Sequence, residues 1–376
     1  MMRLSRSIVG PEEAAAASRV IVEDGYLGMG GEVQRFESEL ASFLGVPPDR
    51  VMCVNSGTAA VQLAVEAAVE PGAEVLVQSL TFVATFQAIA AAGAVPVACE
   101  IDPSSITIDL EDAARRITPR TKAIMPVHYA SYPGDLEAIY AFAHARGLRV
   151  IEDAAHAFGG VHRGRRIGAL ADVACFSFDG IKNITTGEGG AIVSSDPLVC
   201  ARVRDARLLG VEKDTEKRYA GERSWEFDVS RAGYRAHMSN IFAAIGRVQL
   251  RRLLPEFAPA RVAFAKRYRE RLAGVAGVRL LATDLDAVIP HIQPVLIDRG
   301  RRDAVRAALE AAGIQTGVHY KPNHLLTRFG GGQPRLPVTE RVYEELLSVP
   351  LHPGLSAEDV DRVCDVLCTA LERCEV

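Results

Sequence analysis

The chain has 376 residues, of which 48% are hydrophobic and 24% are charged, and its formal net charge is −4. This length exceeds the roughly 250–300 residues at which a single hydrophobic core stops growing, so we expect one large domain and a smaller one. The composition excludes a disordered protein, and the absence of a basic block argues against electrostatic binding to nucleic acid or to a membrane surface.

The apolar runs predict no membrane-spanning segment. The longest, residues 88–99, contains a glycine and a proline and is well short of the roughly 20 residues that cross a bilayer. Residues 1–20 reach Pro11 and two glutamates before any sustained apolar segment, which is unlike a signal peptide. We therefore expect a cytoplasmic protein.

Seven cysteines are present, and most stand within apolar runs, which predicts buried thiols. Cys364 and Cys368 are four residues apart on an expected helix, but no second pair completes a metal-binding pattern. We expect no metal site. The remaining cysteines are Cys53, Cys99, Cys175, Cys200 and Cys374.

Short β-rich runs alternate with helical patterns over roughly the first half of the chain. Strands separated by helices of about ten to fifteen residues predict βαβ units, and hence a mostly parallel sheet that is covered on both faces. Ligands of such sheets gather at the carboxyl ends of the strands. The expected strands are residues 51–54, 74–78, 95–99, 122–127, 148–152, 174–178 and 191–193.

The second half is mainly helical and ends in a compact α+β unit. Residues 213–231 are charged and mixed, which predicts a long surface loop, and a helix is expected from Ser239 to about Leu272 with a break at Pro255. Strands at 278–281 and 287–297 and helices after Arg301 and Ser356 follow, the last opening with a capping box at residues 356–359. We expect a large domain over residues 1–250, with an N-terminal arm, and a small domain over 251–376.

Two segments place polar groups at the expected strand ends. Gly57 and Thr58 follow a strand and open a helix, where free N–H groups suit a phosphate, although the same residues also form an ordinary turn and helix cap. Asp153 ends an apolar run, where a carboxylate needs a cation or a protonated ring nitrogen as partner, and His156 lies one helical turn later. A helix cap followed by a core histidine explains the second segment equally well.

A third segment joins two apolar strands by a glycine-rich loop with Ser177 on one side and Lys182 within it. Lysine is scarce here, six residues against 37 arginines, so a surface cation would usually be arginine. A lysine at 182 indicates an amine that loses its proton and acts as a nucleophile, although a solvated lysine is the simpler alternative. A phosphate cradle, a carboxylate for a ring nitrogen and a lysine for an aldehyde together fit pyridoxal 5′-phosphate.

At this point the sequence resembles the DegT/DnrJ/EryC1/StrS sugar aminotransferases, which have the aspartate aminotransferase fold (type I). The likeness extends from about residue 20 to the C-terminus and lies in seven motifs in order: NSGTAA, TFVATFQAI, GAVPVACEID, VIEDAAHAFGG, FSFDGIKNITTGEGGAIV, GYRAHMSNIFAAIG and HYKP...LPVTERVYEELLSVPLHPGLS. The resemblance implies an α/β protein whose large domain has a mostly parallel seven-stranded sheet, followed by a smaller C-terminal α+β domain.

The resemblance also implies roles for single residues. Lys182 would bond covalently to pyridoxal 5′-phosphate and serve as the catalytic base, Asp153 would pair with the ring nitrogen, and His156 would lie near the ring's phenolic oxygen. Phe82 would stack on the ring, and the phosphate would be held by Ser177, Gly57 and Thr58. His319 and Tyr320 are candidates for contacting the sugar or its diphosphate, or else form a buried structural pair.

The chain departs from the family pattern at one position. Members commonly read G-Y-N-Y-R-M where this chain has residues 233–238, and that Asn reaches the cofactor phosphate of the neighbouring subunit in a homodimer whose active site lies at the subunit interface. Arg235 stands in its place. A guanidinium can hold that phosphate or turn toward the substrate's diphosphate, and the sequence does not decide between them.

The activity implied is transamination of a nucleotide-linked keto-deoxysugar with L-glutamate as the amino donor. The KNITTGEGG motif favours amination at C4 of a 4-keto-6-deoxyhexose over C3. One alternative is a pyridoxamine-dependent sugar dehydratase, which resembles this chain but carries His where Lys182 stands. A regulatory or binding protein that has lost its chemistry is a second alternative, opposed by the Lys182 and Asp153 pair and by the net charge of −4.

Overall fold

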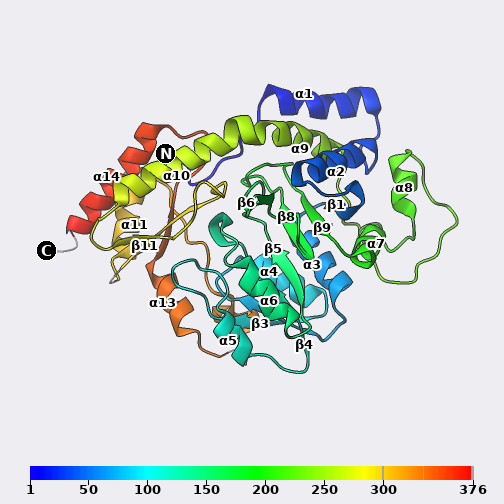
Figure 1. Cartoon of the computed structure of the whole chain (residues 1–376). Coiled ribbons are helices and arrows are strands. Elements are labelled where there is room, and N and C mark those ends of the chain that lie inside the picture. Colours follow the sequence, from blue (N-terminus) through cyan, green and yellow to red (C-terminus); the bar gives the residue numbers. More distant parts are fainter. Residues whose placement is uncertain (299, 333, 374–376) are drawn as a thin grey trace.

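A computed structural model describes residues 1–298, 300–332 and 334–373 (Figure 1). Its centre is a seven-stranded sheet with the strand order β1-β9-β8-β5-β4-β2-β3. Every neighbouring pair from β8 to β3 is parallel, and β9 is antiparallel to both of its neighbours. The predicted mostly parallel sheet is therefore confirmed. The strands are β1 (Val51–Val54), β2 (Glu74–Gln78), β3 (Val95–Cys99), β4 (Thr121–Met125), β5 (Arg149–Asp153), β8 (Val173–Ser177) and β9 (Gly190–Ser194).

Alternation of side chains along the strands separates two apolar layers. In β1, Met52 and Val54 face one core while Val51 and Cys53 face the other, because successive side chains of a strand point to opposite faces. Helices α3 (Gly57–Ala68), α4 (Val83–Ala91) and α7 (Pro197–Ala206) cover the first face. The second is covered by α2 (Gly31–Leu44), α5 (Leu110–Arg115), α6 (Leu136–His144) and α9 (Asn240–Arg252).

One long helical run leads out of this layered unit. Helix α9 continues through a π-helical segment, Leu253–Phe257, into α10 (Ala258–Leu272), and the run extends along the top of Figure 1. The helical run continues through Pro255, so that a π-helical segment stands where a break was predicted. The division at residue 250 stays a prediction, and this run crosses it.

The C-terminal part is a three-stranded antiparallel sheet, β10-β11-β12, packed with helices. The capping box that was predicted at the start of α14 is confirmed, since the N–H of Ser356 donates to Asp359 and the N–H of Asp359 donates to Ser356 Oγ. The elements are β10 (Val278–Leu280), β11 (Gln293–Ile297), α11 (Arg302–Ala311), α12 (Thr327–Gly330), α13 (Pro337–Glu345), β12 (Leu346–Val349) and α14 (Ala357–Arg373).

The stretch 213–231, predicted as a surface loop, contains a helix, α8 (Asp214–Tyr219). Tertiary contacts hold this short helix: the hydroxyl of Tyr219 donates to Glu37 and accepts from Arg207, whose guanidinium is fully buried and paired with Glu37 at 2.6 Å. The charged composition of residues 213–231 does not predict these tertiary contacts. The prediction of a loop was wrong for α8 and right for most of the rest.

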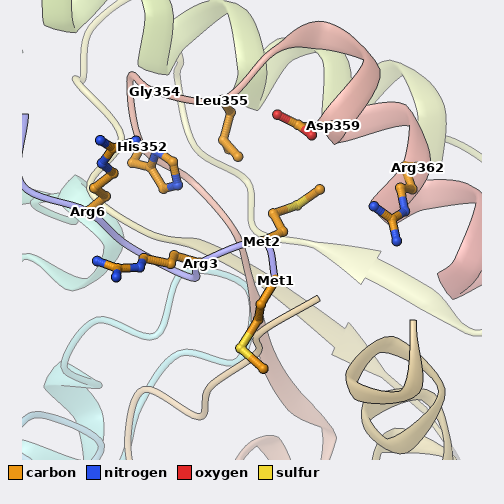
Figure 2. Close-up of a pocket in the computed structure, with 9 residues that line it drawn as sticks. All are labelled: Met1, Met2, Arg3, Arg6, His352, Gly354, Leu355, Asp359 and Arg362. Atoms are coloured by element: carbon orange, nitrogen blue, oxygen red, sulfur yellow. The ribbon is translucent and has the colours of Figure 1, made fainter. Parts of the chain in front are cut away.

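The N-terminal segment lies against the C-terminal unit. Met2 forms a bridge with Ile314, and the N–H of Leu351 donates to the carbonyl of Leu4. Figure 2 shows residues 1–6 running beside His352 and the beginning of α14, around a hollow of about 530 Å³. The chain then passes the loop after β8, where Ser7 contacts Gly180, and reaches α1 (Pro11–Arg19), which packs on α9.

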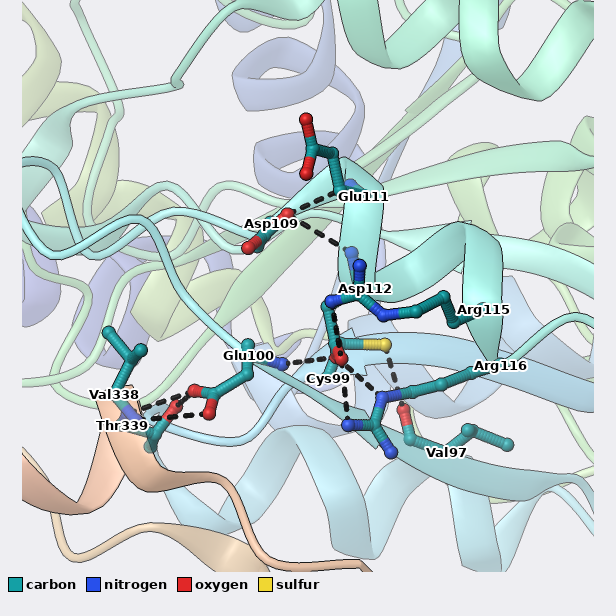
Figure 3. Close-up of polar contacts among 10 residues, drawn as sticks. All are labelled: Val97, Cys99, Glu100, Asp109, Glu111, Asp112, Arg115, Arg116, Val338 and Thr339. Atoms are coloured by element: carbon teal, nitrogen blue, oxygen red, sulfur yellow. Dashed lines mark hydrogen bonds and ion pairs between the residues drawn. The ribbon is translucent and has the colours of Figure 1, made fainter.

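A carboxylate ties the C-terminal unit to the end of β3. Glu100 accepts the N–H groups of Val338 and Thr339 at 3.0 and 2.9 Å and the Thr339 hydroxyl at 2.6 Å, at the first turn of α13 (Figure 3). The N–H of Glu100 donates to Asp112, which also pairs with Arg116. A carboxylate at a helix N-terminus is favourable because it satisfies N–H groups that have no acceptor within the helix.

Five of the six described cysteines are buried, as the sequence predicted, and Cys368 is partly exposed. Cys374 lies outside the described residues. Within the described ranges no helix is long and apolar enough to cross a membrane, and no group of three or more metal-ligating side chains occurs.

Candidate active site

A cavity of about 340 Å³ opens at the carboxyl ends of the parallel strands. Loops after β1, β2, β5 and β8 form most of its wall, and one segment of the C-terminal unit completes it. Nine of the ten site residues expected from the sequence line this cavity, and Arg235 does not. The nine are Gly57, Thr58, Phe82, Asp153, His156, Ser177, Lys182, His319 and Tyr320.

Lys182 lies in the loop between β8 and β9, with its amine at the cavity wall. Burial lowers the pKa of this amine from 10.5 to about 8, because a desolvated ammonium is disfavoured. The negative charges of Asp179 and Asp153 oppose this effect, and Arg261 adds to it. An amine with this pKa is partly unprotonated near neutral pH, as a nucleophile or base requires.

Asp153 is the last residue of β5, and its carboxylate is buried. The hydroxyl of Thr85 donates to one carboxylate oxygen at 2.7 Å, and the N–H of Ala155 donates to the other at 3.2 Å. Thr85 Oγ1 lies 3.1 Å from Thr81 Oγ1. These bonds fix the carboxylate at the cavity wall without supplying a cation, so its charge remains available to a cationic group of a ligand.

The first turn of α3 and the end of β8 form a tight cradle. A Cβ added at Gly57 would lie 2.6 Å from Cβ of Ser177, so only glycine allows this approach. Ser56 caps the helix by accepting the N–H of Ala59, which leaves the two earlier N–H groups of the helix available to an anion. Thr58 adds an exposed hydroxyl at the same place.

Aromatic and imidazole groups also line the cavity. Nε2 of His156 lies 3.1 Å from the hydroxyl of Tyr320, whose ring centroid is 5.2 Å from that of Phe82. Burial and the nearby charge of Lys182 lower the pKa of His156 well below its ordinary value, and the same two causes lower that of His319 to about 4. Both imidazoles are therefore neutral at physiological pH.

Arg235 lies outside this cavity and is exposed. Its backbone carbonyl accepts the Asn55 side-chain amide at 3.3 Å, and it forms an isolated bridge with Leu208. Its neighbours Tyr234 and Leu209, which are joined by a backbone hydrogen bond, have exposed side chains. Within one chain, Arg235 does not line the cavity.

The polar residues of this region that were not predicted from the sequence include Thr85, Glu188 and His291. Thr85 lies in the first turn of α4 and its hydroxyl reaches Asp153, a contact that no local pattern indicated. Glu188, in the glycine-rich loop, lines the cavity mouth. His291 lies 3.4 Å from the Lys182 amine, and no local pattern could have indicated a contact across 109 residues.

The sheet topology and a partly buried lysine of lowered pKa, in one cavity with a strand-end carboxylate, define a type I aminotransferase. The chain belongs to the DegT/DnrJ/EryC1/StrS aminotransferase family, whose model matches residues 9–368. It is a sugar aminotransferase, as the resemblance implied.

Known relatives match over nearly the whole length. The dTDP-4-dehydro-2,3,6-trideoxy-D-glucose 4-aminotransferase of Saccharopolyspora spinosa is 36% identical, covering 99% of this chain and 97% of that protein. The structure of the aminotransferase TlmJ from Streptoalloteichus hindustanus is 36% identical, with a TM-score of 0.92 and full coverage of both chains. The putative sugar aminotransferase Spr1654 from Streptococcus pneumoniae, in its PLP form, is 27% identical, with a TM-score of 0.89, covering 99% of this chain and 99% of that one.

The residues present fit the cofactor that this family implies. The cradle at Gly57 suits a phosphate, the buried Asp153 suits a protonated ring nitrogen, and the Lys182 amine suits an aldehyde. The family and its PLP-bound member imply dependence on pyridoxal 5′-phosphate.

Proposed function

We propose that this enzyme transfers the amino group of L-glutamate to C4 of a nucleotide-linked 4-keto-6-deoxyhexose, with pyridoxal 5′-phosphate held at Lys182. One observation supports the proposal above all: Lys182, whose amine has a pKa lowered to about 8, lines the same cavity as Asp153. When bound, the cofactor supplies an electron sink that stabilises a carbanion next to nitrogen. Proton transfer and the orientation of the reactants are carried out by the chain's own residues.

Lys182 moves the proton in both half-reactions. Its neutral amine removes the proton from the α-carbon of glutamate, and in the second half it returns a proton to the sugar carbon that receives the nitrogen. A pKa of about 8 suits both directions, because a base works best when its pKa lies near the operating pH. One lysine thus serves as base and acid in turn.

The surrounding groups orient this transfer. Asp153, fixed by Thr85, keeps a ring nitrogen protonated, while Phe82 supplies an apolar surface for a ring face and His156 a neutral hydrogen-bonding group. Gly57, Thr58 and Ser177 hold the phosphate by N–H and hydroxyl groups.

The substrate class follows from the relatives and from the cavity wall. The 36%-identical relative is named for 4-amination of a dTDP-linked keto-deoxysugar, and the KNITTGEGG loop favours the same position. In this proposal His319 and Tyr320, which line the cavity, contact the sugar or its diphosphate. The product is a deoxyamino sugar.

The active enzyme is a homodimer in this proposal, and Arg235 of one copy lies at the cavity of the other. The exposed apolar side chains beside Arg235 support burial of this surface against a second copy of the chain.

Mixing chains that carry Arg235→Ala with chains that carry Lys182→Ala tests this shared site. Each variant alone should be impaired, and the mixture should regain activity because one composite site is then intact. A mixture no more active than its components would contradict the shared site.

The reaction itself is tested by incubating the PLP-loaded protein with L-glutamate and either a 4-keto or a 3-keto dTDP-6-deoxyhexose. We expect equimolar 2-oxoglutarate and a new amine at C4, located by NMR, with the 4-keto sugar only. Amination at C3, or glutamate consumption without an amino sugar, would contradict the proposal.

A further inference from the structure

The amine of Lys182 has one hydrogen-bond partner among the described residues, Nε2 of His291 at 3.4 Å. His291 stands just before β11 in the C-terminal unit and is 3% exposed. It is not among the described residues that line the cavity, whereas Lys182 is. The ring is therefore a neighbour of the reactive lysine rather than part of the cavity lining.

The backbone of His291 is fixed on both sides. Its N–H donates to Ser131 Oγ at 3.0 Å, and the same hydroxyl donates to the carbonyl of His156. Its carbonyl accepts from the buried guanidinium of Arg261 at 3.1 Å, which also bonds the carbonyls of Pro290 and Leu351. A ring carried by so constrained a backbone holds its position relative to the loop of Lys182.

The groups around His291 keep its ring neutral. Burial and then the positive charge of Lys182 lower the pKa of His291 well below its ordinary value, with smaller effects from His156, Arg261 and His319. Its ring centroid lies 4.5 Å from that of His156, and Nδ1 has no partner in the described part of the chain. A neutral imidazole has one nitrogen that accepts a hydrogen bond.

We propose that His291 is a positioning residue for Lys182: its neutral Nε2 accepts a hydrogen bond from the amine and holds Nζ in one orientation at the cavity wall. This inference rests on the proposed function, in which Lys182 bonds the cofactor and carries protons. A free lysine side chain has several rotamers, so a fixed acceptor reduces the orientations from which the amine must react. The same bond favours the ammonium form and partly offsets the effect of burial.

Capture of pyridoxal 5′-phosphate by the apoprotein, followed by absorbance across a pH series, tests this role without turnover. The variants are His291→Phe, which keeps a ring but has no acceptor, and His291→Gln, whose side-chain oxygen restores one. In the wild type the capture rate should rise with pH with a midpoint near 8 and level off above it. In His291→Phe the midpoint should fall by about one pH unit, and the plateau rate should drop about tenfold. His291→Gln should stay within about threefold of the wild type.

Two outcomes would overturn the role of His291: a wild-type profile in His291→Phe, or equal losses in the Phe and Gln variants, which would indicate packing alone. Failure of the proposed function looks different, since then the wild type captures no cofactor or Lys182→Ala still captures it.

A second test does not depend on the folding of His291→Phe. In wild-type protein labelled with ¹⁵N-histidine, the NMR chemical shifts of the His291 ring nitrogens should change with pH with a midpoint near 8. This change should vanish in Lys182→Met. A titration unaffected by Lys182→Met would also overturn the proposal.

Discussion

The cavity has two walls of different origin. One is formed by loops that follow strands of the large sheet and carries Lys182, Asp153 and the cradle at Gly57. The other comes from the C-terminal unit, with His319 and Tyr320 lining the cavity and His291 at 3.4 Å from the Lys182 amine. In our proposal the first wall supplies the reacting groups, and the second contacts the sugar and positions Lys182. This difference predicts large losses of activity from the first wall and graded effects from the second.

The largest effect is expected for Lys182→Ala, which removes the base. Activity should fall by at least about 10³-fold, because positioned proton transfer contributes about 10²–10⁴-fold. Single-turnover rates with glutamate measure the loss. Lys182→Arg serves as the matched control, since it keeps a cation that cannot deprotonate, and it should be equally impaired. Activity within tenfold of the wild type in either variant would remove Lys182 from its role.

Asp153→Asn should come next, with a loss of about 10²-fold or more. A neutral amide cannot keep a ring nitrogen protonated, so turnover should fail while the cofactor, measured by absorbance, stays bound. Asp179→Asn, which changes another carboxylate of the same cavity, should cost less. Equal losses in the two variants would show that only the net negative charge of the cavity matters.

Gly57→Ala should weaken cofactor binding by about tenfold without abolishing turnover at saturation. The added methyl would lie 2.6 Å from Cβ of Ser177 and would force the cradle apart. Gly28→Ala is the control, because a methyl there meets no atom within 4 Å. Equilibrium titration of the apoprotein gives both affinities, and indistinguishable values would contradict the cradle.

The smallest effect is expected where the C-terminal unit attaches to the large sheet. Glu100→Gln should lower the free energy of unfolding by about 2 kcal/mol, because a charged acceptor for two N–H groups at the start of α13 is lost. Glu111→Gln, at an exposed site in the same region (Figure 3), should change it by less than about 0.5 kcal/mol. Denaturant titration compares them, and equal stabilities would show that Glu100 does not hold the two units together.

The two walls also differ in how far the sequence could predict them. Parallel strands bring their carboxyl ends to one edge, so glycines, a carboxylate and a lysine that follow separate strands are expected to meet, as they do. His291 belongs to the C-terminal unit and contacts Lys182 only through the tertiary arrangement of that unit against the sheet. Local sequence patterns do not predict this arrangement. Helix α8 was missed for a similar reason, since Tyr219 is held by Arg207 and Glu37 from elsewhere in the chain.

Covalent attachment of the cofactor to Lys182 is tested by borohydride reduction of the PLP-loaded protein followed by peptide mass spectrometry. The chain has six lysines, so the assignment is unambiguous. We predict one added phosphopyridoxyl group per chain, on the peptide that contains Lys182. The added mass on any other lysine, or on none, would contradict the account.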